Sequence, residues 1–336
     1  MSHTAGRPLV VGKKLYCAWD PDLGTKNRDF LAGVDPSYYA YVAEVHGPLV
    51  AGEQAKHAAL AIRLAYSQAL ETFFALLGAA IQAPHAAVAW VLLYKANDLK
   101  WLVEQLVAGA PVRTLLRDGD TSWRGLAAAM HKLVDDPEQR AQLTDACATL
   151  WAQFAADFLD KPALDEYNSI KHGLRARTRG LTVSVAPAAP DGGPPPDEAF
   201  LVLGAADFGG GFYVKEPAAK DKGARGNIRL RYCYRSWTPE HLVAGLELLA
   251  ISIHNVLTTL RVEAGGARDA LHFLAPEDAA AFARAALAQR GFWTEAQHGP
   301  PPEPANYCTP EQILAFYDAA EAKGREEPPA PPGPPG

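Results

Sequence analysis

Apolar residues recur at steps of three and four along most of the chain, which is typical of helices with one buried face. The clearest pattern predicts a helix over residues 53–82, and a second helix over residues 84–108. Further helices are expected over residues 122–134, 136–159, 163–175, 238–262, 277–289 and 310–322. The apolar stripe of the first helix consists of Leu60, Leu64, Leu70, Phe73, Phe74, Leu77 and Ile81.

Three of these helices have a recognisable start, in which a capping residue is followed by proline. The pairs are Asp136-Pro137, Thr238-Pro239 and Thr309-Pro310, and each is followed by glutamate. A side-chain oxygen can accept a hydrogen bond from a free backbone N–H of the first turn, and proline fits the first helical position. We therefore expect helices to begin at these three prolines.

Between residues 181 and 237 the periodicity changes to short segments rich in Val, Tyr and Phe, separated by glycine- and proline-rich pieces. Residues 228–235 alternate arginine with apolar residues, which places one face on a core and the other in water. We expect strands at residues 181–185, 200–204, 211–215 and 228–237, forming an antiparallel meander. The predicted fold class is mainly α, a helical bundle with a small inserted β-meander.

These patterns divide the chain into five predicted regions. The first is an irregular segment with two short strands, and the last is a proline- and glycine-rich tail that cannot form a core and is expected to be disordered. In order, they are an irregular N-terminal segment (residues 1–50), a helical bundle (51–180), a β-meander insert (181–237), C-terminal helices that complete the bundle (238–325) and the tail (326–336).

Composition narrows the possible classes of protein. The 336 residues are 49% hydrophobic and carry a formal net charge of −6, so the overall field does not attract nucleic acid. Residues 72–94 lack Asp, Glu, Lys and Arg and are long enough to span a bilayer. However, Gln82, Pro84 and His85 lie at their centre, so we expect two buried helices meeting at a corner and no membrane span.

The sequence contains few signs of a cofactor or of export. It has no GxGxxG or GxxxxGK[ST] phosphate loop, no HExxH zinc motif and no GxSxG nucleophile motif, so no cofactor and no metal are expected. The N-terminus lacks the apolar core of a signal peptide, and we expect a soluble cytoplasmic protein. The cysteines lie singly, without zinc or disulfide spacing, at positions 17, 147, 233 and 308.

One segment, residues 166–175, combines residue types that suit chemistry on a phosphate. On a helix, Asn168, Lys171, His172 and Arg175 share one face, and the opposite face carries Tyr167, Ile170 and Leu174. His172 titrates near neutral pH, and an imidazole kept neutral by flanking cations can abstract a proton. The same four residues could also form an ordinary solvated face. Arg177 and Arg179 extend the basic run.

Asn168 to Gly173, together with the surrounding bundle, resembles the HEPN superfamily of helical domains, over about 120 residues at most. Members often carry a short polar motif ending in histidine, and many are ribonucleases or nucleotidyl-transfer partners in defence and toxin–antitoxin systems. The family's ribonuclease motif places an arginine about four to six residues before that histidine. This chain has no arginine in that stretch, which includes Glu166 and Tyr167, so the resemblance favours a member that binds without cleaving.

We therefore consider three functions. The leading hypothesis is a binding module for RNA or a protein partner, without robust catalysis and with a homodimer as the candidate oligomer. The alternative is a HEPN-type metal-independent ribonuclease, in which His172 is the general base, Lys171 or Arg175 stabilises the phosphorane charge and Asn168 orients the phosphate. The third is a small-ligand pocket between helices, for which the sequence shows no motif.

Overall fold

The computed structural model describes residues 6–116, 119–173, 175–187, 195–217, 227–268, 271–289, 293–296 and 308–325. They are mainly α-helical with small antiparallel sheets, which confirms the predicted fold class. The chain divides into two compact units. One comprises residues 1–211 and 235–293, and the other comprises residues 212–234 and 294–336.

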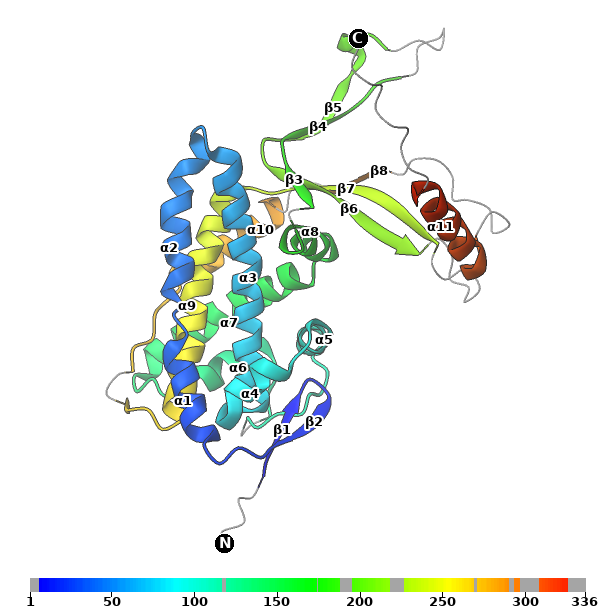
Figure 1. The fold of residues 1–336 in the computed structure, drawn as a ribbon. Helices are drawn as coiled ribbons and strands as arrows, with labels where there is room; N and C mark the ends of the chain where they lie inside the picture. The colour runs from blue at the N-terminus through cyan, green and yellow to red at the C-terminus, as the bar shows by residue number, and fades with distance from the viewer. Residues whose placement is uncertain are drawn as a thin grey trace, which may run out of the picture. The chain divides into compact units, whose positions relative to one another are not determined.

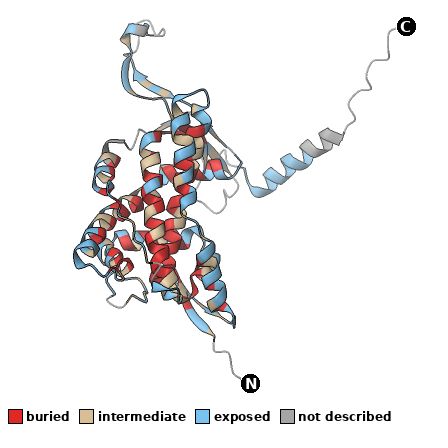
Figure 2. Ribbon diagram, turned by 90° about the vertical axis from the view of Figure 1, so that its left-hand side faces the viewer, coloured by how far each residue is buried: buried red, intermediate tan, exposed pale blue. Residues whose placement is uncertain are grey.

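The core of the first unit forms around two long helices, α3 (Ala55–Gln82) and α9 (Pro239–Glu263), which pack side by side (Figure 1). Helix α7 (Pro137–Leu159) contributes Trp151 and Phe154, and both contact Phe73 of α3. Buried residues are concentrated on these central helices, as Figure 2 shows. This arrangement follows from the three- and four-residue apolar spacing, which gives each helix a side that only another helix can cover.

The capped helix starts lie where the sequence places them. The Asp136 carboxylate accepts a hydrogen bond from the backbone N–H of Glu138 at 3.0 Å, and α7 begins at Pro137. Helix α6 (Trp123–Met130) is capped by Ser122 in the same way. Helices α9 and α11 (Pro310–Arg325) begin at their prolines, so the three predicted starts are confirmed.

The prediction that residues 1–50 are irregular is wrong. After the hairpin of β1 (Arg7–Val11) and β2 (Lys14–Ala18), the chain forms α1 (Leu23–Gly33), α2 (Ser37–His46) and a 3₁₀ turn (Gly47–Ala51). Helix α1 buries only Leu23, Asn27 and Leu31, one residue per turn, so its apolar stripe is too narrow to recognise. The sequence Asp35-Pro36-Ser37 leads into α2, and the Asp35 carboxylate accepts a hydrogen bond from the Ser37 N–H.

Gln82, the polar residue inside the long apolar stretch, joins the first hairpin to the core. Its side chain accepts hydrogen bonds from the Gly12 N–H (2.9 Å) and the Trp90 indole (3.1 Å), and donates to the carbonyls of Gly12 and Arg113. The chain turns here through Pro84–Ala86 into α4 (Ala87–Leu93). The predicted corner between two buried helices is confirmed, and a buried amide with this many partners stabilises it.

Among the residues that the structure describes, two helices, α3 and α9, are long and apolar enough to cross a membrane. In each, 72% of the most apolar window is buried inside the structure. The core helix of a water-soluble protein meets the same criteria of length and composition, so this finding is weak evidence for a span.

The helix predicted over residues 84–108 is interrupted after α4. Tyr94 and Lys95 are extended, and a new helix, α5, runs from Ala96 to Val107. The Asp98 side chain accepts a hydrogen bond from the Lys95 N–H, which caps the first turn of α5. Because of this break, α5 is a separate helix from α4, and its first residues, Ala96 and Asn97, line a cleft described below.

The predicted strands form, and they belong to separate small sheets. Strands β4 (Leu181–Val185) and β5 (Leu201–Ala206) pair antiparallel with each other. Strands β6 (Gly209–Pro217) and β7 (Ile228–Ser236) are neighbours in another sheet, and their central parts lie in the second unit together with α11. The remaining elements are β3 (Ala176–Thr178), α10 (Ala279–Gln289), β8 (Trp293–Ala296) and a 3₁₀ turn at Asp197–Ala199. The predicted tail at 326–336 lies outside the described residues.

Candidate functional site

The segment predicted to carry the site is a shorter helix than expected. Helix α8 runs from Lys161 to Lys171, so the prediction that it continues to Arg175 is wrong. Gly173 has φ +107°, a conformation that suits glycine and ends the helix. His172 and Arg175 therefore lie beyond the helix and do not extend the face that carries Asn168 and Lys171.

All four predicted site residues, Asn168, Lys171, His172 and Arg175, are exposed. Within the described part of the chain, the His172 side chain makes no hydrogen bond. The structure therefore brings Asn168 and Lys171 together on one helix, and places His172 and Arg175 on the segment that follows.

Lys171 lies on the same side of α8 as Tyr167, its neighbour one turn earlier, and not opposite it as predicted. Its ammonium lies 5.2 Å from the centre of the Tyr167 ring and 3.7 Å from Oε2 of Glu71 on α3. Residues four apart on a helix share a face, and the long Lys171 side chain covers the aromatic ring. The predicted partner on the opposite face, Leu174, lies outside the described residues.

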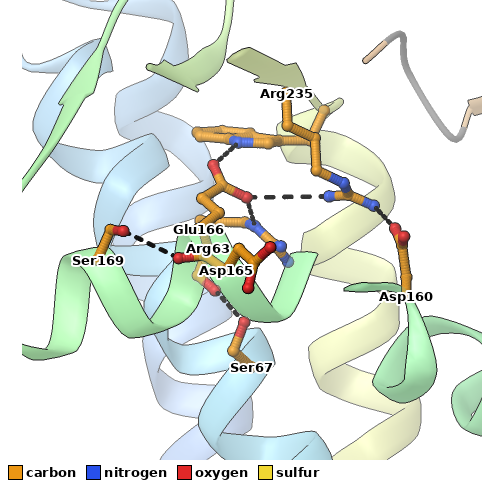
Figure 3. Close-up of polar contacts among 8 residues, drawn as sticks. Arg63, Ser67, Asp160, Asp165, Glu166, Ser169 and Arg235 are labelled. Atoms are coloured by element: carbon orange, nitrogen blue, oxygen red, sulfur yellow. Dashed lines mark hydrogen bonds and ion pairs between the residues drawn. The ribbon is translucent and has the colours of Figure 1, made fainter. Parts of the chain in front are cut away.

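Beneath this surface, α8 presents a buried carboxylate, Glu166, to an arginine of α3. The Arg63 Nε donates to Glu166 Oε2 at 2.9 Å, and the Trp237 indole donates to Oε1 at 2.9 Å (Figure 3). Glu166 is 0% exposed and Arg63 is 3% exposed. A charge pair so far from water is tolerated only when both charges are hydrogen-bonded.

A second arginine extends this buried pair toward solvent. Arg235 donates to Asp160 at 2.7 Å and lies 3.9 Å from Glu166 Oε2, so two arginines share one buried carboxylate (Figure 3). The backbone of β6 passes directly over Glu166, because a Cβ atom on Gly210 would lie 2.3 Å from Glu166 Oε1. The glycine triplet at residues 209–211 begins β6, and the missing side chain of Gly210 allows this close approach.

The sequence does not single out Arg63 as a site residue or identify Glu166 as its partner. The buried stripe of α3 includes Ile62, Arg63, Tyr66 and Leu70, whereas the predicted stripe members Leu60 and Leu64 are half-buried. Arg63 lies about three turns before Phe74 on the same face of α3, and a charged residue on a face that is otherwise apolar is the signal that could have identified it.

Next to this ion pair is a cleft between helices α3, α5, α7 and α8, with a cavity volume of about 180 Å³. Its lining combines apolar side chains with charged ones, and its exposed lining residues, which form the mouth, are Ala96, Asn97, Asn168 and Lys171. The lining residues are Arg63, Ser67, Leu70, Glu71, Ala96, Asn97, Leu99, Lys100, Asp157, Phe158, Ala163, Leu164, Tyr167, Asn168 and Lys171. Two of the four residues singled out from the sequence, Asn168 and Lys171, lie at this cleft.

Two tyrosines hold the Glu71 carboxylate inside the cleft. Tyr94 donates to Oε1 at 3.3 Å, and Tyr167 donates to Oε2 at 3.2 Å. Burial, reinforced by the charge of Glu71, raises the pKa of both tyrosines, so both hydroxyls remain protonated. They act as fixed donors to Glu71 and are not available as bases near neutral pH.

Asp157 is the second carboxylate of the cleft, and it is engaged in the same way. Tyr66 donates to Oδ2 at 2.6 Å and Gln153 donates to Oδ1 at 2.9 Å. Burial, then the charge of Asp157, raises the pKa of Tyr66, which therefore stays protonated. Asp157 and Arg63 also line a smaller cavity of about 40 Å³ on their other side, so together they form a wall between two cavities.

A second polar cluster, His131 with Cys147 and Asn255, is completely buried elsewhere in the first unit. Its Cys147 Sγ lies 3.9 Å from His131 Nε2, and Asn255 lies 3.3 Å from the same nitrogen. Burial raises the pKa of Cys147 to about 12 and lowers the pKa of His131, so both groups are neutral. A nucleophilic cysteine needs the opposite shift, so this cluster is structural.

Within the residues that the structure describes, no three His, Cys, Asp or Glu side chains gather as metal ligands would. The histidine in the apolar run of α9, His254, bonds the backbone carbonyl of His272 at 2.8 Å, as a satisfied histidine does. No family model, curated protein or solved structure matches the chain. The proposal below is argued from the cleft and its charged lining residues.

Proposed function

We propose that the chain is a binding module for a small organic molecule, with the cleft between α3, α5, α7 and α8 as its binding site. The observation that carries the proposal is a cavity of about 180 Å³ that combines an apolar lining with fixed charges. Ligand sites in helical proteins form between facing helices in this way, with few polar groups placed precisely in an apolar wall.

The volume limits the size of the ligand. Pockets for drug-sized molecules measure about 300–1,000 Å³, whereas an engineered cavity of about 150 Å³ accepts benzene. A cavity of about 180 Å³ therefore suits a molecule with a single ring or a short aliphatic chain. It is too small for a dinucleotide cofactor or a base with its sugar and phosphates.

Binding accounts for the geometry better than catalysis does. A general base must be oriented by a hydrogen-bonded partner, and His172 has none among the described residues. The two carboxylates of the cleft, Glu71 and Asp157, each already accept two hydrogen bonds. The ribonuclease alternative therefore has less support than a binding role.

Three probes of similar size and different charge test the proposal: benzoate, benzyl alcohol and benzylamine. Ligand-observed NMR detects dissociation constants in the millimolar range, about −4 kcal/mol of binding free energy, which is adequate for such small molecules. We expect at least one probe to bind the wild type. Ser67→Leu, which places a larger side chain in the cleft, should abolish that binding.

Gln68→Leu is the matched control, because Gln68 is the next residue of α3, is also half-buried and does not line the cleft. It should bind the probes as the wild type does. Circular dichroism would establish that both variants are folded. If no probe binds, or if Ser67→Leu binds as well as Gln68→Leu, the cleft is not the binding site.

A second candidate function, RNA binding, is favoured by the exposed cations that follow α8. Lys171, His172, Arg175 and Arg177 are all exposed at the end of the helix and in β3. Binding to labelled single-stranded RNA across a salt series tests this, because phosphate contacts weaken steeply with salt. Arg175 and Arg177 lie outside the cleft, so the double variant Arg175→Gln/Arg177→Gln should weaken RNA binding and leave binding of the small probes unchanged. Loss of RNA cleavage in His172→Ala would support the ribonuclease alternative. If the protein neither binds nor cleaves RNA, RNA is not its partner, and a protein partner is the alternative that remains for this basic segment.

A further inference from the structure

The carboxylates and the cations of the cleft differ in how far they are already paired. Each oxygen of Glu71 and each oxygen of Asp157 already accepts one hydrogen bond from a tyrosine or a glutamine. Both negative charges are therefore stabilised by two donors each, although every oxygen keeps a second lone pair.

The donors at the mouth are in the opposite situation. The side chains of Asn97 and Asn168 are exposed, and neither forms a hydrogen bond with any residue that the structure describes. Lys171 lies 3.7 Å from Glu71, and Lys100 lies 3.7 Å from Glu104 of its own helix. Both distances exceed the normal length of an N–H···O hydrogen bond, so the two ammonium groups keep donors available.

Two further features add positive potential. Ala96 and Asn97 are the first two residues of α5, so the N-terminal end of that helix, with its free backbone N–H groups, lies at the mouth. In the wall, the Nη2 group of Arg63 has no hydrogen-bond partner within the described residues.

Resting on the proposed function above, we infer that the ligand is a small monocarboxylate with an apolar body. Its carboxylate accepts hydrogen bonds from Lys171, Lys100 and the asparagines at the mouth. The body, a single ring or short chain, fills the apolar part of the cleft formed by Leu70, Leu99, Phe158 and the Tyr167 ring. A carboxylate offers the two ammonium groups an acceptor of opposite charge, which forms stronger hydrogen bonds than a neutral oxygen does.

The order of affinities for the three probes tests the inference. Benzoate should bind at least fivefold more tightly than benzyl alcohol, and benzylamine should bind more weakly than both. Lys171→Gln should reduce the affinity for benzoate by about five- to tenfold, as expected for loss of a charge-assisted hydrogen bond. The same substitution should leave the affinity for benzyl alcohol unchanged, because the alcohol carries no charge.

Lys161→Gln serves as the control substitution. Lys161 is an exposed lysine of the same helix, paired with Asp165, and it does not line the cleft, so its loss should not change benzoate binding. Equal affinity for the three probes, tighter binding of benzylamine, or unchanged benzoate binding in Lys171→Gln would overturn the inference while leaving the cleft as a binding site. Failure of all three probes would instead refute the proposed function.

Discussion

Replacing Glu166 by glutamine tests whether the buried ion pair beneath the cleft has the structural role assigned to it. Glutamine keeps the shape of the side chain and can still accept the hydrogen bond from Trp237, so the main loss is the negative charge. Arg63, 3% exposed, would then keep its positive charge without the carboxylate 2.9 Å away. Removing one partner of such a pair costs about 3–5 kcal/mol, because the other charge stays buried and uncompensated.

That cost is large beside the total stability of a folded domain, about 5–15 kcal/mol. With a urea dependence of about 1–3 kcal/mol per molar, Glu166→Gln should lower the unfolding midpoint by about 1–2 M or more, measured by circular dichroism. Asp165→Asn is the control, since its carboxylate pairs with exposed Lys161 and should contribute less than about 1 kcal/mol. Removing both buried charges in Arg63→Met/Glu166→Gln should recover part of the loss. Equal midpoints for Glu166→Gln and the control would refute this reasoning.

Three further predictions follow from buried groups. Gly78→Ala should destabilise the protein by about 1–3 kcal/mol in urea unfolding, although alanine favours helix, because the new Cβ would lie 2.6 Å from the Trp90 ring. At about pH 8 iodoacetamide should alkylate exposed Cys17 and not buried Cys147, whose pKa burial raises to about 12, as mass spectrometry would detect. Burial lowers the pKa of His131, so stability should fall as the pH drops below about 6.5, where the unfolded state takes up a proton first. His131→Gln should flatten that slope between about pH 7.5 and about pH 5.5, measured from urea midpoints.

Helices and their starts could be predicted from the sequence because their determinants are local. The apolar spacing of α3, the Asp136-Pro137 start of α7 and the Pro239 start of α9 each depend on residues within a few turns. The narrow stripe of α1 and the glycine that ends α8 are weaker signals, so the sequence does not predict α1 or its neighbour α2 and extends α8 too far.

The cleft could not be predicted, because its determinants are far apart in the chain. Arg63 and Glu166 are separated by 103 residues, and Glu71 and Tyr167 by 96. Local periodicity places each residue on a helix face, but packing decides which faces meet. Lys171 was selected from the sequence for its charge, and its position at the mouth of a cavity depended on where α3 lies.

The central claim, that the cleft holds a small carboxylate, is tested most directly by locating a heavy-atom analogue. Crystals soaked with para-bromobenzoate would give an anomalous signal from the bromine. The account predicts a bromine peak inside the cavity near Leu70 and Phe158, with the carboxylate directed toward Lys171 at the mouth. A bromine site elsewhere on the protein with the cleft empty, or a molecule bound with its carboxylate pointing into the apolar interior, would contradict it.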